Sequence, residues 1–178
     1  MKNIIVFTSS ELGGAERSLT RMALASPSGL YKLATLDGEG PWCDWVRDQG
    51  ERPLVFGVRN GVRHGKLSFT ALTSLIRYVL IENIQVIYIC GLRASLWLRL
   101  LKPFMLRVKL VHGIRTDPST NSLSDVICRF IERWLNWLVD LYIVNSKKAS
   151  TLIIECDSAY SVNPMVMVGD NLSEPTFF

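Results

Sequence analysis

Short apolar runs rich in β-branched residues alternate along the chain with longer segments whose apolar residues recur at helical spacing. The short runs are typical of buried strands, and the longer segments are typical of helices that cover a sheet. This alternation predicts an α/β fold, a Rossmann-like, doubly wound and mostly parallel sheet of about seven strands. The expected strands are Asn3–Thr8, Tyr31–Leu36, Pro53–Phe56, Gln85–Cys90, Arg107–His112, Leu141–Asn145 and Met165–Val168. The expected helices are Gly14–Ala25, Trp42–Gln49, Lys66–Glu82, Leu92–Leu101, Leu123–Val139 and Lys147–Cys156.

Two of these helices carry aromatic side chains on one side. In Leu123–Val139 the apolar stripe is expected to be core, and it comprises Val126, Ile127, Phe130, Trp134, Trp137 and Leu138. In Leu92–Leu101, Arg99 and Lys102 form a narrow basic strip beside Trp97. That segment either packs on the sheet or rests its basic and aromatic edge, continued by Phe104 and Arg107, on an anionic bilayer.

Length and composition predict one globular lobe. The chain has 178 residues, of which 48% are hydrophobic, which is too apolar for disorder and too short for two full domains. We expect the lobe to span residues 1–168 and residues 169–178 to be a linker or a truncated junction. No apolar stretch is long enough to span a membrane, and the first residues are typical of a strand rather than a secretory signal, which favours the cytoplasm.

Charge is unevenly distributed along the chain. The formal net charge is +4, but residues 52–115 carry 11 basic side chains and Glu82 as the only acid, between two mildly acidic segments. Such a block either forms a solvated face or attracts phosphate-bearing ligands, anionic lipids or nucleic acid. The four cysteines are widely spaced and have no neighbouring histidine, so no metal site is expected.

The first candidate site follows the first strand. Ligands of open parallel sheets bind beyond the carboxyl ends of the strands. Gly13 and Gly14 stand there at the entry to a helix, where exposed N–H groups and the helix dipole favour phosphate. Their spacing matches neither the dinucleotide-binding nor the nucleoside-triphosphatase glycine motif. The pair also fits a plain tight turn, with Glu16 opposite the positive end of the helix dipole.

Three other strand ends carry candidate residues. Arg93 follows the fourth strand near a helix N-terminus, where no dipole favours a cation, so it either serves an anionic partner or is a plain surface arginine. His112 ends the fifth strand and is followed by Arg115, a position from which a histidine can hydrogen-bond a sugar hydroxyl or orient a phosphate. Ser146 follows the sixth strand and is expected to cap the next helix rather than act as a nucleophile.

These loops in this order resemble the N-terminal lobe of the GT-B glycosyltransferases of family 4. Gly13-Gly14-Ala15-Glu16-Arg17-Ser18-Leu19 is similar to that family's GGAER-type loop, and Val111-His112-Gly113 to its histidine-bearing strand end. Asp140–Ser146 is similar to its D-x-(apolar)-x-x-S strand and cap, and the resemblance continues to about Val168.

The resemblance implies one lobe of a two-lobed enzyme with its active site between the lobes. It places Gly13 and Gly14 near the diphosphate of a nucleotide-sugar donor, and His112 near the transferred sugar as the catalytic residue. Glu16, Arg93 and Arg115 are placed at the acceptor rim, the two arginines on loop position alone. The implied reaction is a cofactor-free, metal-independent sugar transfer with retention, to a lipid-linked or polysaccharide acceptor, at the inner face of the membrane or in the cytoplasm.

The chain also departs from the family. It lacks the E-x7-E motif of the donor lobe, and Gly169-Asp170-Asn171 stands where relatives read N-G-(I/V)-D. We therefore expect an acceptor-side lobe that needs a separate donor lobe and turns over poorly alone. The alternative is a non-catalytic membrane-surface or partner-docking module of the same fold. A sugar-nucleotide epimerase is less well supported, and nucleic-acid binding least, because no recognition helix or RNA-binding signature is present.

Overall fold

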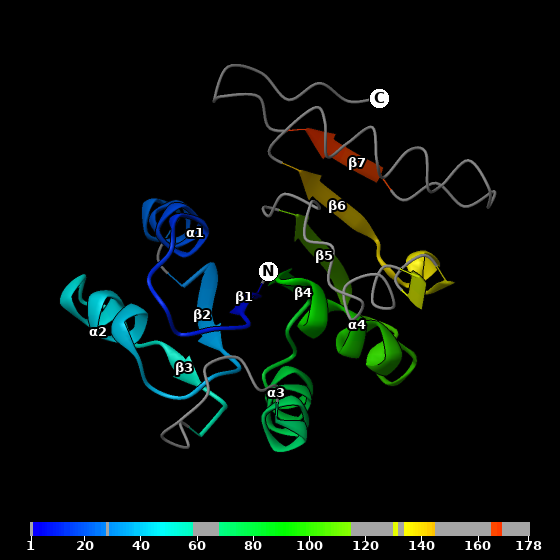
Figure 1. Ribbon diagram of the computed structural model, residues 1–178, viewed down its shortest axis with the longest axis horizontal. Helices are drawn as coiled ribbons and strands as arrows, with labels where there is room; N and C mark the ends of the chain where they lie inside the picture. Colours follow the sequence, from blue (N-terminus) through cyan, green and yellow to red (C-terminus); the bar gives the residue numbers. More distant parts are fainter. Residues whose placement is uncertain are drawn as a thin grey trace. The chain divides into compact units, whose positions relative to one another are not determined.

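Figure 1 shows a computed structural model of the protein, which describes residues 2–27, 29–58, 68–114, 130–131, 134–144 and 165–168. The chain divides into two compact units, Met1–Cys90 (unit 1) and Gly91–Phe178 (unit 2). The described residues contain seven strands, four in unit 1 and three in unit 2, and every pairing within a unit is parallel.

Unit 1 is a parallel sheet with helical crossovers. Its strands are β1 (Asn3–Phe7), β2 (Tyr31–Thr35), β3 (Leu54–Val55) and β4 (Val86–Cys90), in the spatial order β3-β2-β1-β4. The connections contain α1 (Gly14–Ala25), α2 (Pro41–Asp48) and α3 (Phe69–Ile81). The chain moves outward from β1 to β3 and then returns to the other side of β1, and right-handed crossovers therefore place α1 and α2 on one face and α3 on the other (Figure 1).

The core of unit 1 forms around β1. Ile4, Ile5, Val6 and Phe7 are fully buried, as expected for a parallel strand covered on both faces. Trp42 of α2 packs edge-on against Phe7, with ring centroids 4.9 Å apart. Its indole N–H donates to the hydroxyl of Thr20 on α1, 3.0 Å away. The hydrogen bond satisfies both polar groups in the core and joins two helices on the same face of the sheet.

Unit 2 contains three parallel strands. Its strands are β5 (Lys109–Ile114), β6 (Leu141–Val144) and β7 (Met165–Val168), in that spatial order. Helix α4 (Leu92–Leu101) continues into a 3-10 turn, η1 (Lys102–Phe104), and a second 3-10 turn, η2 (Asn136–Leu138), precedes β6.

The expected α/β fold with a parallel sheet is confirmed, and several element bounds need correction. β5 continues two residues beyond His112, to Ile114. The helix expected over Leu123–Val139 does not run to its end, because residues 136–138 form a 3-10 turn. The rest of that helix up to residue 129, and the whole helix expected over Lys147–Cys156, lie outside the described residues. So do residues 169–178. No helix in the described part of the chain is long and apolar enough to cross a membrane.

The aromatic stripe expected to be core is largely on the surface. Phe130, Trp134 and Trp137 are 63–64% exposed, and of the stripe's described members only Leu138 is buried. Phe130 and Trp134 contact each other instead, with ring centroids 6.3 Å apart. Helical spacing correctly placed the first two side chains on one side, but it could not show whether another element covers that side.

Candidate functional site

The carboxyl ends of β1 and β4 are fastened together in unit 1. Phe7 is in register with Cys90, and the hydroxyl of Thr8 donates a hydrogen bond to the carbonyl oxygen of Cys90 over 2.8 Å. β1 is the strand from which the chain leaves in one direction toward β2 and β3, and beside which it returns as β4. This is the topological switch point of the unit, where open α/β sheets bind ligands.

Helix α1 begins beside this point, and its N-cap residue is a glycine. Gly13 is in an extended conformation and has no side chain that could cap the helix. The first intrahelical bond runs from the Arg17 N–H to the Gly13 carbonyl, 3.2 Å away. A Cβ added at Gly14 would meet no atom within 4 Å, so the backbone is open on that side. Exposed amides and the helix dipole suit an anion here.

Glu16 lies over this N-terminus. A Cβ at Gly13 would come within 2.5 Å of a Glu16 carboxylate oxygen, which shows that the side chain folds back toward the N-cap. A carboxylate in the first turn is stabilised by the helix dipole, and it occupies the region that an incoming phosphate would also favour. The structure thus brings Gly13, Gly14 and Glu16 together, as the sequence predicts.

The loop after β1 is held by the loop after β2, a feature that sequence reasoning missed. Asp37 accepts hydrogen bonds from the Ser10 hydroxyl at 3.3 Å and the Ser10 N–H at 3.5 Å. The Ser10 carbonyl accepts a hydrogen bond from the backbone N–H of Trp42 at 2.9 Å. A Cβ at Gly40 would lie 2.9 Å from the same carbonyl oxygen. The Asp-Gly pair after the second strand and the Gly-Pro pair before the next helix were the available signals. These contacts fix the path of the chain toward Gly13.

His112 lies inside β5 of unit 2 and is only 2% exposed. Its Nδ1 is 2.9 Å from a terminal nitrogen of Arg99 on α4. The same Arg99 nitrogen donates to the Tyr142 hydroxyl on β6 at 2.8 Å, and that hydroxyl donates to the side-chain oxygen of Asn136 on η2. The Arg99 guanidinium also lies 5.6 Å from the centre of the Tyr142 ring. Four elements of unit 2 thus meet at one buried polar cluster.

Arg99 and Lys102 do not form the expected basic surface strip. Arg99 is fully buried, and the Lys102 side chain is only 13% exposed. Lys102 pairs with Asp140 and donates to the Val108 carbonyl, and Asp140 also accepts from the Leu110 N–H at 2.7 Å. Two cations of the basic block are therefore internal to unit 2.

The remaining predicted residues are only partly described. Arg93 is the second residue of α4, but its side chain is outside the description. Arg115 and Ser146 lie outside the described residues. Within the described part of the chain, no three His, Cys, Asp or Glu side chains gather as a metal site would require.

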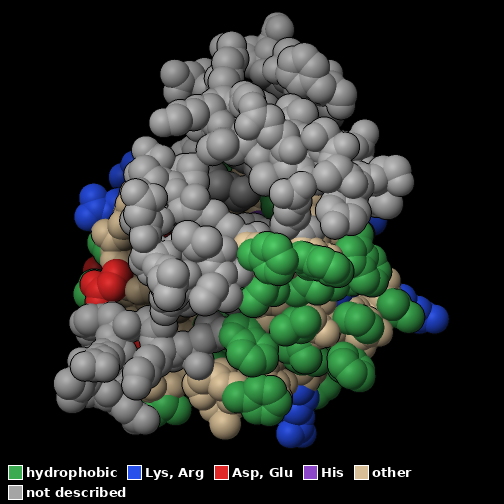
Figure 2. Space-filling model, turned by 45° about the vertical axis from the view of Figure 1, so that its right-hand side comes forward, with side chains coloured by type: hydrophobic (Ala, Val, Ile, Leu, Met, Phe, Trp, Pro, Cys, Tyr) green, Lys and Arg blue, Asp and Glu red, His purple; other side chains and the backbone are tan. Residues whose placement is uncertain are grey.

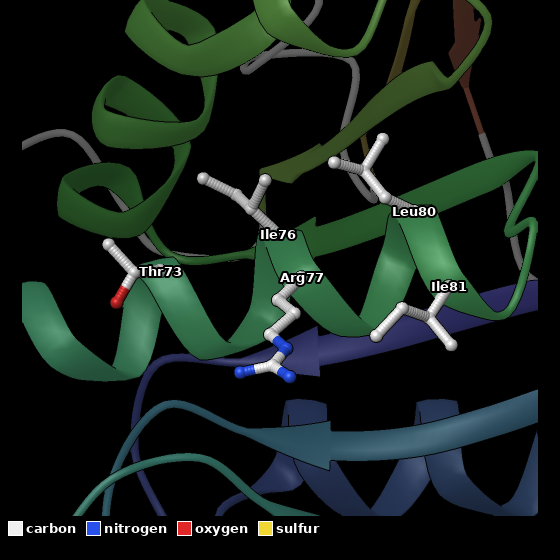
Figure 3. Close-up of a pocket in the computed structure, with 5 residues that line it drawn as sticks. All are labelled: Thr73, Ile76, Arg77, Leu80 and Ile81. Carbon is white, nitrogen blue, oxygen red and sulfur yellow. The ribbon is translucent and has the colours of Figure 1, made fainter.

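A surface pocket of about 440 Å³ lies on α3 (Figure 3). All its lining residues come from this one helix, and Leu80 and Ile81 are at the helix end that leads into the amino end of β4. The pocket therefore lies away from the carboxyl ends of the strands. Its lining residues are Thr73, Ile76, Arg77, Leu80 and Ile81.

Comparison with known proteins identifies the fold. No protein-family model and no curated protein sequence matches this chain. The structure is similar to that of Anabaena Alr3699/HepE, which was solved in complex with UDP and glucose, with a TM-score of 0.62 and 18% sequence identity over 88% of this chain. The alignment covers 41% of HepE, so this chain spans less than half of that protein's length. Pyridoxal kinase from Entamoeba histolytica aligns over 94% of this chain and 63% of its own, but a TM-score of 0.44 with 9% identity does not indicate a shared fold.

Proposed function

We propose that this chain is the acceptor-side lobe of a glycosyltransferase that uses a nucleotide-sugar donor. The proposal rests on the glycine-led N-terminus of α1, with Gly13 and Gly14, beside the β1–β4 switch point. The fold similarity to HepE, a protein solved with UDP and glucose, supports the same ligand class. The remainder of the active site would come from a second lobe, in keeping with the 41% coverage of HepE.

The proposed chemistry is a metal-independent transfer with retention at the anomeric carbon. In this proposal the amides at Gly13 and Gly14 stabilise the diphosphate of the donor, which carries increasing negative charge as the bond to the sugar breaks. His112 donates a hydrogen bond to the transferred sugar. Glu16, Arg93 and Arg115 belong to the acceptor rim, where arginines would bind an anionic, lipid-linked or polysaccharide acceptor.

Transfer by the reassembled enzyme tests the proposal. The chain is mixed with, or fused to, its cognate donor lobe, and release of nucleoside diphosphate is measured with and without acceptor. We expect release that requires both lobes and a nucleotide sugar. The release should be lower for a His112→Ala variant that still folds. Transfer that is unchanged in His112→Ala would remove His112 from the site, and absence of transfer with every nucleotide sugar would refute the enzyme assignment.

A second candidate function is docking of unit 2 on an anionic bilayer. Residues 97–106 carry four exposed apolar side chains, Trp97, Leu100, Phe104 and Leu106, which we call the α4–η1 corner; Phe104 and Leu106 are 74% and 82% exposed. Arg107 and Lys109, both exposed, follow it directly. On the face of the molecule that Figure 2 shows, hydrophobic side chains of the described residues gather together, and Lys and Arg side chains lie at the edge.

The combination of apolar and basic side chains favours a bilayer over a purely apolar partner. Tryptophan and phenylalanine insert at the headgroup level, and each nearby cation adds about 1 kcal/mol on an anionic surface. The cations of this candidate are Arg107 and Lys109, because Arg99 and Lys102 are engaged inside unit 2.

Sedimentation with vesicles tests this candidate. We expect wild-type protein to bind vesicles containing phosphatidylserine at low salt and to dissociate as salt increases. Phe104→Ser with Leu106→Ser should abolish binding, whereas Val58→Ser, which removes an exposed apolar side chain of unit 1, should not. No binding at low salt, or equal binding by all variants, excludes the bilayer as the partner of this corner.

A further inference from the structure

The buried contact between Arg99 and His112 determines where the imidazole carries its proton. A guanidinium has five N–H donors and no acceptor, so it can contact a histidine ring nitrogen favourably only if that nitrogen accepts. Nδ1 of His112, 2.9 Å from the Arg99 nitrogen, must therefore be without a hydrogen. The hydrogen of a neutral ring is then on Nε2.

The neighbouring hydrogen bonds agree with Arg99 as the donor and Nδ1 of His112 as the acceptor. A terminal guanidinium nitrogen has two hydrogens, and Arg99 directs one to His112 and the other to the Tyr142 hydroxyl. That hydroxyl accepts from Arg99 and donates its own hydrogen to the Asn136 side-chain oxygen. The hydrogen bonds described among these four side chains are consistent with a neutral His112.

A doubly protonated ring at this position would place a second cation against the guanidinium. Both side chains are at most 2% exposed, so water would screen little of the repulsion. Burial of an arginine is itself costly, and apolar residues could fill the same space more cheaply.

We infer that Arg99 is a positioning residue for His112: it holds the ring in the neutral Nε2–H tautomer, in which Nε2 is a hydrogen-bond donor. The importance of this tautomer for catalysis rests on the proposed function. In this state Nε2 cannot serve as a general base, because its lone pair is not available.

Long-range proton–nitrogen NMR correlation on the full-length, nitrogen-15-labelled chain tests the tautomer without a ligand. The sequence has two histidines, so a His64→Gln variant assigns the signals of His112. At neutral pH we expect a protonated Nε2 and an unprotonated Nδ1. A protonated Nδ1, alone or together with Nε2, overturns the inference, and this measurement requires no Arg99 variant to fold.

Variants at Arg99 separate positioning from a structural role. Arg99→Lys, which also only donates, should keep the Nε2–H tautomer, whereas Arg99→Met should allow the Nδ1–H form or the imidazolium to appear. Arg107→Met removes an exposed arginine of the same unit and should leave His112 unchanged. If Arg99→Met lowers the melting temperature but His112 keeps its tautomer, Arg99 is purely structural. If the tautomer is confirmed but no nucleotide sugar binds or reacts, the proposed function fails and the positioning of His112 stands.

Discussion

The hydroxyl of Thr8 donates a hydrogen bond to the carbonyl oxygen of Cys90, 2.8 Å away, across the carboxyl ends of two neighbouring parallel strands. The two residues are 82 positions apart in the sequence, and helices α1, α2 and α3 lie between them. The hydrogen bond therefore joins two strands at the switch point of unit 1. It also fixes the start of the loop that leads to Gly13. A glycine-rich loop binds phosphate well only if its backbone is held in place before the ligand arrives.

Thr8→Val should therefore destabilise the protein. The substitution keeps the shape but leaves the half-buried Cys90 carbonyl without this donor, which costs about 1–2 kcal/mol in the free energy of unfolding. Thr73→Val is the control, because the Thr73 hydroxyl bonds an exposed carbonyl of its own helix that water can satisfy. Urea denaturation measures both. Equal stability of the two variants would show that the Thr8 bond is dispensable.

Glu16→Gln should strengthen binding of a nucleoside diphosphate. The Glu16 carboxylate folds back toward the N-cap of α1, where it repels an incoming phosphate. Removing a partly exposed negative charge gains roughly 1 kcal/mol, or about fivefold in affinity, if the ligand phosphate lies about 4 Å away. Titration calorimetry with UDP measures the change, and Glu51→Gln, at an exposed position of the same unit, is the control. Weaker binding by Glu16→Gln would instead assign the carboxylate a direct contact with the ligand.

Two lysine ion pairs should contribute very differently to stability. Lys102, 13% exposed, bonds Asp140 and the Val108 carbonyl and joins η1 to the start of β5 and β6, so Lys102→Met should cost about 1–3 kcal/mol. Lys2 pairs with Glu82 at 3.0 Å, but both side chains are more than 40% exposed, and Lys2→Met should cost less than about 1 kcal/mol. The comparison is made by thermal unfolding. A larger loss of stability in Lys2→Met than in Lys102→Met would contradict the stabilising role of the Lys102–Asp140 pair.

Cys43 should resist alkylation at alkaline pH. Burial raises the pKa of the Cys43 thiol, so the reactive thiolate forms at a higher pH than it does in an unfolded chain. The folded state then retains a proton that the unfolded state loses above about pH 8.5, and this thiol makes the protein less stable as the pH rises further. Peptide mapping after iodoacetamide should show slower modification of Cys43 than of the partly exposed Cys90. Faster modification of Cys43 would argue against its burial.

Sequence patterns predicted the elements of this fold better than the environment of their side chains. The bounds of α1, α4 and β7 agree with the expected ranges, because runs of apolar residues at period two or 3.6 are local properties of the chain. The burial of Arg99 was not predicted, because its partners His112 and Tyr142 are 13 and 43 residues away. The exposure of Trp134 and Trp137 was missed for a related reason: a stripe is core only if another element covers it.

In the candidate site, only the contacts between residues that are neighbours in sequence could be predicted. Gly13, Gly14 and Glu16 are neighbours in sequence, and their proximity follows from the start of one helix. The contact between Ser10 and Asp37, which holds the same loop, depends on the pairing of β1 with β2 and could not be read from either loop alone.

An NMR titration of the full chain with UDP, observed at the backbone amides, is the sharpest test of a phosphate site at the start of α1. We predict saturable shifts of the Gly13, Gly14 and Ala15 amides with UDP and much smaller shifts with uridine, which lacks the phosphates. Gly14→Ala, which adds a methyl group where the backbone is open, should weaken these shifts without unfolding the protein, whereas Ser18→Ala on the same helix should not. Unchanged Gly13 and Gly14 amides at millimolar UDP, or equal shifts with uridine, would contradict a phosphate site at the start of α1.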